Sequence, residues 1–238
     1  MNKPKMVLIH GWDYANYTSS GCLDPWVNRV RFVEALSRHF EIVKIRLPGF
    51  GGQPNPLKPW SLDDYVEYVS AIIDKENPES ILGYSFGGAI ALRWEKNNSD
   101  KGKRIFLVSP AIIRQYRSKN MSLIQKTLKV TLSTKFLSKL RDFYLTKVVR
   151  NPFYTKATPI MRETYRNIVA IDLRDDLLSL QAPVTLIYGE KDTATPPELV
   201  RKVIGNAKVK HELNVIASGG HDIANFNTEK IISLIVER

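Results

Sequence analysis

The chain has 238 residues, and 43% of them are hydrophobic, which suits one large α/β domain or two small ones. Its single cysteine, Cys22, excludes an internal disulfide and a cysteine-based metal site. The four histidines are scattered rather than set at ligand spacings, so we predict no metal and no cofactor. No window approaches about eighteen consecutive apolar residues, and the start leaves no room for a signal peptide, so a cytoplasmic protein is expected.

The net charge is +11, and the excess of positive charge is confined to one segment. Residues 111–170 carry 13 Lys and Arg against two acidic residues, Asp142 and Glu163, whereas the rest of the chain carries 22 residues of each sign. Such a segment suits a nucleic acid, an anionic membrane or an acidic protein as partner. No nucleic-acid-binding motif accompanies it, so no nucleic acid is expected.

Apolar runs alternate with helical patterns along the chain. The runs predict buried strands at 6–9, 42–45, 81–82, 104–109, 183–189 and 211–216. Patterns of three- and four-residue steps predict helices around 26–36, 62–73, 88–92 and 197–204, and from about 228. This alternation predicts a mostly parallel sheet covered on both faces, with ligands bound at the carboxyl ends of the strands.

A long insert interrupts the alternation between Pro110 and Gln181. It has no strand pattern, and its apolar residues recur at helical spacing with Lys and Arg at the other positions. We therefore expect a core formed by residues 1–110 and 181–238, and a helical basic lid formed by residues 111–180 that overhangs one end of the sheet.

The serine at position 85 stands in a sequence that predicts a sharp turn. Gly83-Tyr84-Ser85-Phe86-Gly87 lies between a short apolar run and a small-residue helical pattern. Glycines two before and two after a serine allow a strained strand-to-helix turn that exposes its hydroxyl. The pattern is weak alone, and it gains weight when an acid and a histidine follow in the right order.

Taken together, several pieces resemble the α/β-hydrolase fold superfamily. They are His10-Gly11-Trp12, Leu47-Pro48-Gly49-Phe50-Gly51, the turn around Ser85, Gly189-Glu190-Lys191-Asp192 and Gly219-Gly220-His221. The resemblance implies a reduced, about six-stranded parallel sheet flanked by helices, with a helical lid insert. The chain departs from the family at Arg46, where an aspartate is common, and in a longer loop from Asp13 to Pro25.

The resemblance implies Ser85 as the nucleophile, Asp192 as the acid and His221 as the base. A serine hydroxyl needs an imidazole to take its proton, and the imidazole needs a carboxylate to orient it. The backbone amides of Trp12 and Phe86 would then form the oxyanion hole. The competing acid Asp222 is adjacent to the histidine and is expected to point away from it.

These residues predict a serine carboxylesterase that hydrolyses small to medium esters through an acyl-enzyme. A lactonase or a C–C bond hydrolase would use the same three residues, and a receptor built on the same scaffold is the alternative from another class. Haloalkane dehalogenases and epoxide hydrolases are disfavoured, since they have aspartate in place of the serine. Aromatic residues expected in the substrate pocket are Tyr14, Phe50, Trp60, Phe136, Phe143 and Tyr144.

The basic lid has two interpretations. It is either the solvated outer face of amphipathic helices or a docking surface for an acidic carrier protein or an anionic membrane. The stretch from Ile171-Asp172-Leu173-Arg174 to Asp192 is similar to the corresponding part of the carboxylesterases that demethylate a pimeloyl ester on an acyl carrier protein, and this resemblance implies an acidic partner.

Overall fold

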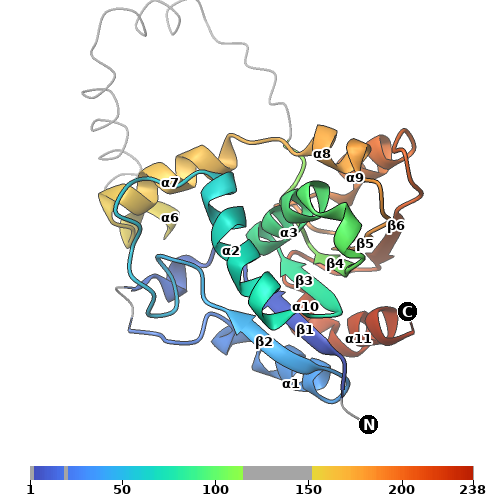
Figure 1. The fold of residues 1–238 in the computed structure, drawn as a ribbon, viewed down its shortest axis with the longest axis horizontal. Coiled ribbons are helices and arrows are strands. Elements are labelled where there is room, and N and C mark those ends of the chain that lie inside the picture. Colours follow the sequence, from blue (N-terminus) through green and yellow to red (C-terminus); the bar gives the residue numbers. More distant parts are fainter. Residues whose placement is uncertain (1–2, 19–20, 115–151, 238) are drawn as a thin grey trace, which may run out of the picture.

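The computed structural model describes residues 3–18, 21–114 and 152–237, and these form a six-stranded parallel sheet with helices on both faces (Figure 1). Each strand falls in a segment for which the sequence predicts one, so the reduced parallel sheet is confirmed. The strands are β1 (Lys5–Ile9), β2 (Glu41–Ile45), β3 (Ser80–Tyr84), β4 (Arg104–Val108), β5 (Thr185–Gly189) and β6 (Glu212–Ile216).

The strand order creates a crevice at the carboxyl edge of the sheet. The order is β2-β1-β3-β4-β5-β6, and all neighbouring strands are parallel. The chain passes from β1 to β2 on one side and then returns to β3 on the other side of β1. The loops after β1 and β3 therefore run to opposite sides of the sheet and leave a crevice between them. Open α/β sheets bind ligands in such a crevice.

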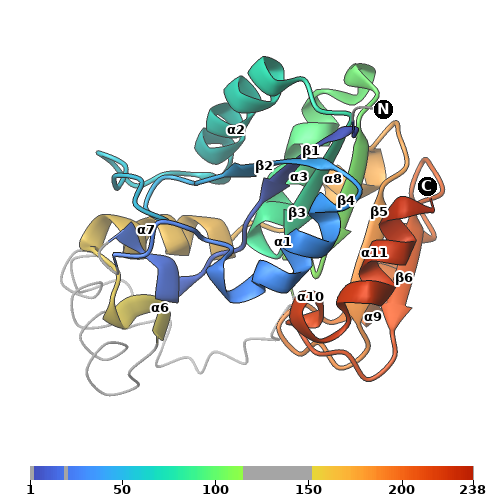
Figure 2. The same ribbon diagram turned by 90° about the horizontal axis from the view of Figure 1, so that it is seen from below.

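Helices cover the sheet on two faces, and each face has its own apolar core. The helices are α1 (Val30–Ser37), α2 (Leu62–Glu76), α3 (Phe86–Asn97), α6 (Pro152–Thr155), α7 (Pro159–Val169), α8 (Arg174–Ser179), α9 (Pro197–Ile204), α10 (Ile223–Phe226) and α11 (Thr228–Val236). Alternate residues of β1 enter different cores: Val7 packs with α2 and α3, and Leu8 packs with α1 and α11. Figure 2 shows α2 and α1 on opposite sides of the strands.

The start of α2 is fixed by its cap. The hydroxyl of Ser61 accepts the backbone N–H of Asp64, and the Asp64 carboxylate accepts the backbone N–H of Ser61. This reciprocal pair satisfies two donors that a helix leaves free at its N-terminus. The cap that the sequence predicts at Ser61 is therefore confirmed.

Of the expected lid, residues 111–114 and 152–180 are described, and the second of these ranges contains α6, α7 and α8. Helix α7 packs on the loop after β2, because the hydroxyl of Thr164 accepts the backbone N–H of Trp60 at 3.0 Å. Residues 115–151, which include Phe136, Phe143 and Tyr144, lie outside the described residues. The short helix α10 lies in a segment for which the sequence predicts no element.

The long loop after Trp12 docks on the loop after β2. Backbone hydrogen bonds join Thr18 to Gly49 at 3.0 Å and Gly51 to Asn16 at 2.9 Å, and Tyr17 forms a bridge with Phe50. Residues 13–18 of this loop therefore lie beside the crevice. Among the described residues, no helix combines the length and apolar content needed to cross a bilayer.

Candidate active site

Ser85 occupies the sharp turn between β3 and α3. Its backbone lies at φ 51° and ψ −109°, a strained conformation for any residue with a side chain. A Cβ atom at Gly83 would overlap the carbonyl oxygen of Gly87, and one at Gly87 would overlap that of Ile9. The turn therefore requires both glycines, and it places the Ser85 side chain in the wall of a cavity at the carboxyl edge of the sheet.

The side chains of Ser85, His221 and Asp192 form a continuous hydrogen-bonded row. His221 Nε2 lies 3.1 Å from Ser85 Oγ, and His221 Nδ1 lies 2.8 Å from Asp192 Oδ2. An ionised carboxylate only accepts hydrogen bonds, so Nδ1 carries the proton and Nε2 accepts the serine hydroxyl. Loops after β3, β5 and β6 bring these residues together, although Ser85 and His221 are 136 positions apart.

The Asp192 carboxylate is buried, and both of its oxygens accept hydrogen bonds from the protein. It accepts the backbone N–H groups of Ala194 at 2.9 Å and Thr195 at 2.8 Å, and the Thr195 hydroxyl at 2.6 Å. Burial acts to raise the pKa of Asp192, but the hydrogen bonds from His221 and Thr195 outweigh it and lower the pKa below its ordinary value. The group is therefore ionised at neutral pH.

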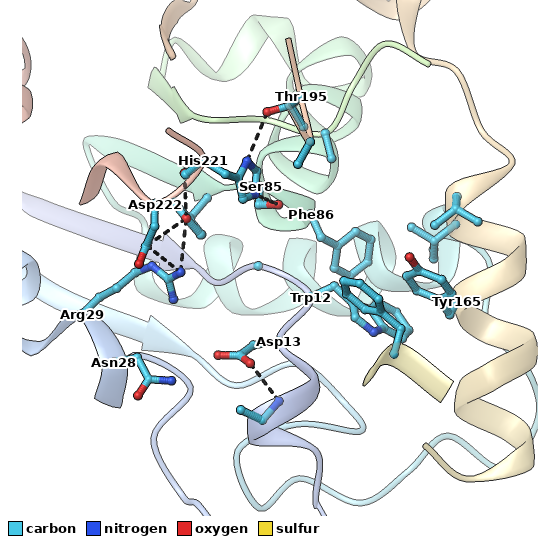
Figure 3. A pocket seen from close by; sticks show the side chains of 18 of the residues that line it. Trp12, Asp13, Asn28, Arg29, Ser85, Phe86, Tyr165, Thr195, His221 and Asp222 are labelled. Atoms are coloured by element: carbon cyan, nitrogen blue, oxygen red, sulfur yellow. Dashed lines mark hydrogen bonds and ion pairs between the residues drawn. The ribbon is translucent and has the colours of Figure 1, made fainter. Parts of the chain in front are cut away.

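Asp222, the residue after the histidine, is engaged elsewhere. Its Oδ1 lies 2.8 Å from Nη2 of Arg29 and 3.2 Å from the hydroxyl of Tyr84. The guanidinium also lies 4.2 Å from the centroid of the Tyr84 ring, and the Tyr84 hydroxyl lies 3.0 Å from the carbonyl oxygen of His221. This cluster anchors the loop that carries His221 to the end of β3, and Figure 3 shows its Arg29 and Asp222 side chains beside each other.

His10 ties the loop after β1 to the loop after β2. Its Nδ1 donates to the carbonyl oxygen of Gly11 at 2.8 Å, and its Nε2 accepts the backbone N–H of Leu47 at 3.1 Å. Burial lowers the pKa of His10 to about 4, so the ring is neutral, as one donor and one acceptor nitrogen require.

Trp12 and Phe86, whose backbone amides are the predicted oxyanion hole, belong to segments that adjoin Ser85. A Cβ atom at Gly11 would come within 3.2 Å of Ser85 Cβ, so the loop after β1 passes directly beside the turn at Ser85. Phe86 begins α3, where backbone N–H groups have no partner within the helix. Among the described residues, neither amide has a hydrogen-bond acceptor.

A cavity of about 520 Å³ is lined by Ser85 and His221 at one end of the hydrogen-bonded row. One wall is aromatic: the Trp12 ring centroid lies 5.4 Å from that of Phe86 and 5.3 Å from that of Tyr165, which belongs to α7 (Figure 3). Arg114 and Arg29 also line the cavity. The site thus offers an apolar wall with a few fixed polar groups, as sites for small organic ligands usually do.

Two of the six aromatic residues predicted for the substrate pocket, Phe50 and Trp60, lie away from the cavity. Phe50 is fully buried behind Trp12, and Trp60 packs on Tyr65 of α2, so neither lines the cavity. Tyr14 lies in a short 3-10 helix, Tyr14–Asn16, within the loop after Trp12. The other three predicted aromatic residues lie outside the described residues.

Sequence reasoning missed several residues of the site, namely Thr195, Tyr84, Arg29, Arg114 and Tyr165. A signal existed for Thr195, because aspartate side chains often accept the backbone N–H groups two and three positions later and so close a turn. In this chain those N–H groups belong to Ala194 and Thr195. The others lie far apart in sequence, and only the folded chain brings them together.

Comparisons with known proteins agree with this architecture. The chain is 24% identical over 260 aligned positions to the AB hydrolase superfamily protein YisY of Bacillus subtilis, covering 98% of this chain and 90% of that one. It is 21% identical to a pimeloyl-[acyl-carrier protein] methyl ester esterase of Pseudoalteromonas atlantica, with 98% and 93% coverage.

Among solved structures, an esterase from Exiguobacterium antarcticum has a TM-score of 0.69 at 18% identity and covers 100% of this chain and 92% of that one. A meta-cleavage product hydrolase from Pseudomonas fluorescens has a TM-score of 0.67 at 21% identity, with 100% and 91% coverage. The model of the alpha/beta hydrolase family matches residues 6–231. The chain therefore belongs to the alpha/beta hydrolase family.

Proposed function

We propose that the protein is a serine carboxylesterase that uses Ser85, His221 and Asp192 as a catalytic triad. The observation that carries this proposal is the hydrogen-bonded row in which His221 lies 3.1 Å from the serine hydroxyl and 2.8 Å from the buried carboxylate. The esterases among its relatives support an ester as substrate. The same row argues against a receptor without catalytic activity.

In the first half of the proposed reaction, the serine oxygen attacks the ester carbonyl. His221 Nε2 takes the serine proton, and the Asp192 carboxylate stabilises the imidazolium that forms. The oxyanion is held by the N–H groups of Trp12 and Phe86. His221 then gives the proton to the leaving alkoxide, and the alcohol departs to leave an ester of Ser85.

In the second half, water repeats these steps on the acyl-enzyme. His221 accepts a proton from the water molecule, the hydroxide adds to the acyl carbonyl, and the same amides hold the oxyanion. The proton returns to Ser85 Oγ as the carboxylic acid leaves. No other group is required, because acid and base catalysis alternate on one imidazole.

The test is hydrolysis of p-nitrophenyl esters from acetyl to palmitoyl by the wild type and by Ser85→Ala. We expect turnover by the wild type and a loss of about a million-fold in kcat for the variant, as for removal of a triad nucleophile. Far-UV circular dichroism and the unfolding midpoint serve as folding controls. Ester turnover retained by Ser85→Ala would exclude the proposed nucleophile.

Two further kinds of substrate distinguish a carboxylesterase for simple esters from a lactonase and from an esterase for carrier-bound esters. Lactones are cyclic esters that need the same steps, so a preference for them over open esters would identify a lactonase. Some relatives are named for action on a methyl ester held by an acyl carrier protein. A carrier-bound methyl ester is therefore the third arm, and its use would support the proposed docking of an acidic carrier at the basic segment.

A further inference from the structure

Arg114 lies in the cavity wall close to the nucleophile turn. The backbone N–H of Ala111 donates to the carbonyl oxygen of Ser85 at 3.0 Å, and Arg114 follows three residues later. Its guanidinium is held at the end of α7, where Nε donates to the carbonyl oxygen of Ile171 at 2.9 Å and Nη2 to that of Ile168 at 3.3 Å. The C-terminal end of a helix favours a cation, so the side chain is fixed before a ligand arrives.

These two bonds use one edge of the planar guanidinium. Nε and Nη2 form the occupied edge, and Nη1 and Nη2 form the second edge. No described residue accepts a hydrogen bond from Nη1. The second edge therefore keeps a pair of parallel N–H donors, whose spacing matches the two oxygens of a carboxylate.

The charge of Arg114 is also not neutralised by a direct partner. The other cation of the cavity, Arg29, pairs with Asp222 at 2.8 Å. The guanidinium of Arg114 has no carboxylate oxygen within 4.0 Å in residues 3–18, 21–114 and 152–237. Asp172 accepts its backbone N–H instead and pairs with Arg174 at 3.5 Å. Burial lowers the pKa of Arg114, which marks a cation that an added anion would stabilise.

Tyr165 supplies a second donor on the same wall. Its ring stacks on Phe153 with centroids 5.0 Å apart and lies 5.3 Å from Trp12, so its position is fixed by packing. Burial raises the pKa of Tyr165, which keeps its hydroxyl protonated at neutral pH. No described residue bonds to this hydroxyl, and the side chain faces the cavity shared with Phe86 (Figure 3).

We propose that Arg114 and Tyr165 bind a free carboxylate of the substrate, so that the preferred substrate is an ester that also bears a carboxylate. The carboxylate belongs either to the acyl part, as in the monoester of a dicarboxylic acid, or to the alcohol part. The proposal rests on the esterase function above, because it names the second recognition point of the same cavity. The apolar wall of Trp12 and Phe86 would contact the chain that joins the ester and the carboxylate.

The test compares charged esters with neutral partners of equal length. Monomethyl dicarboxylates from succinate to suberate are paired with methyl alkanoates, and acetyl esters of ω-hydroxy acids are paired with acetyl esters of simple alcohols. We expect the wild type to hydrolyse the charged ester faster than its neutral partner in one of these two series. The series in which this happens shows whether the acyl part or the alcohol part of the substrate carries the carboxylate. In Arg114→Gln this ratio of kcat/KM should fall about tenfold or more, the size expected for losing a bond to a charged group.

Matched variants separate recognition from structure. Arg114→Lys should retain part of the preference, and Tyr165→Phe should reduce it by a smaller factor. Arg104→Gln removes the same charge at the start of β4, on the opposite edge of the sheet, and should leave the ratio unchanged. A purely structural role of Arg114 predicts a lower unfolding midpoint and equal losses on charged and neutral esters, which would overturn the proposal.

An inhibition measurement and a binding measurement complete the experiment. A free dicarboxylate should inhibit competitively, and its inhibition constant should rise in Arg114→Gln. Turnover of neutral esters without any preference for charge or inhibition by dicarboxylates would defeat this proposal and leave the esterase function standing. Dicarboxylate binding, followed by the intrinsic tryptophan fluorescence of the wild type and of Arg114→Gln, without turnover of any ester would defeat the esterase function and leave the carboxylate site standing.

Discussion

Thr195 contacts both Asp192, the proposed acid, and His221, the proposed base. Its hydroxyl donates to Asp192 Oδ2 at 2.6 Å and lies 3.3 Å from His221 Nδ1. In Thr195→Val the shape is kept but a hydrogen bond that lowers the pKa of Asp192 is lost, so the pKa of Asp192 rises and its carboxylate is held less firmly beside His221. We expect kcat to fall about tenfold and the acidic limb of the kcat/KM profile to move to higher pH.

The measurement is a pH profile of ester hydrolysis with two comparison variants. Thr195→Ser keeps the hydroxyl and should restore most of the activity, whereas Thr193→Val changes an exposed threonine two residues earlier and should have no effect. A profile of Thr195→Val that overlays the wild type would show that the hydroxyl plays no part.

At the level of single residues, sequence reasoning works where chemistry and order restrict the choice. Ser85, Asp192 and His221 are predicted from motif and order, and the structure brings their side chains within hydrogen-bond distance. Phe50 and Trp60 were expected in the pocket because they are aromatic and near the motifs. Their direction depends on tertiary packing, and both turn into neighbouring aromatic clusters instead.

At the level of elements, the turn from β3 into α3 depends on the absence of side chains. A Cβ atom at Gly87 would overlap the carbonyl oxygen of Ile9 in the adjacent strand, which is backbone and cannot move aside. We expect Gly87→Ala to lose about 3 kcal/mol or more of unfolding free energy, at the upper end for overpacking, together with ester hydrolysis. Urea unfolding and the ester assay measure both.

Gly205→Ala is the matched control for that substitution. Gly205 has an ordinary helical φ of −61°, and a Cβ atom there meets nothing within 4 Å. This variant should be as stable as the wild type or slightly more so, since alanine reduces the freedom of the unfolded chain. Equal stability of the two alanine variants would refute the packing argument.

The elements themselves follow closely from the sequence. All six strands are confirmed. In β1 and β4 four consecutive apolar residues are buried because both faces of the sheet are covered, whereas the edge strands β2 and β6 are partly exposed and include Lys44 and Asn214. The helix α10 was not predicted, because four residues are too short to show helical periodicity.

At the level of the whole molecule, two buried groups make opposite contributions to the pH dependence of stability. His10 has a pKa of about 4 when folded and 6.5 when unfolded, so the unfolded chain binds more protons in this range and stability falls as the pH falls. Glu95 on α3 has its pKa raised by burial from 4.5 to about 7, and neither of its oxygens has a hydrogen-bond partner in the described residues. The folded chain keeps this proton, so stability falls as the pH rises.

Each contribution amounts to at most about 3 kcal/mol, and they oppose each other between roughly pH 4.5 and 6.5. His10→Asn should therefore lose stability as the pH rises through this window, and Glu95→Gln should gain it. Urea unfolding at several pH values measures the two slopes. The exposed controls His39→Asn and Glu67→Gln should run parallel to the wild type, and equal slopes in His10→Asn and Glu95→Gln would contradict the assignment.

The distribution of the proposed catalytic side chains along the chain has a consequence for synthesis. The serine is made early, and its base follows 136 residues later, after β5 and β6 have been added to the edge of the sheet. A growing chain on the ribosome therefore carries the strained serine turn without a base beside it and remains inert toward esters. The onset of ester hydrolysis would then report the moment at which the last two strands join the sheet.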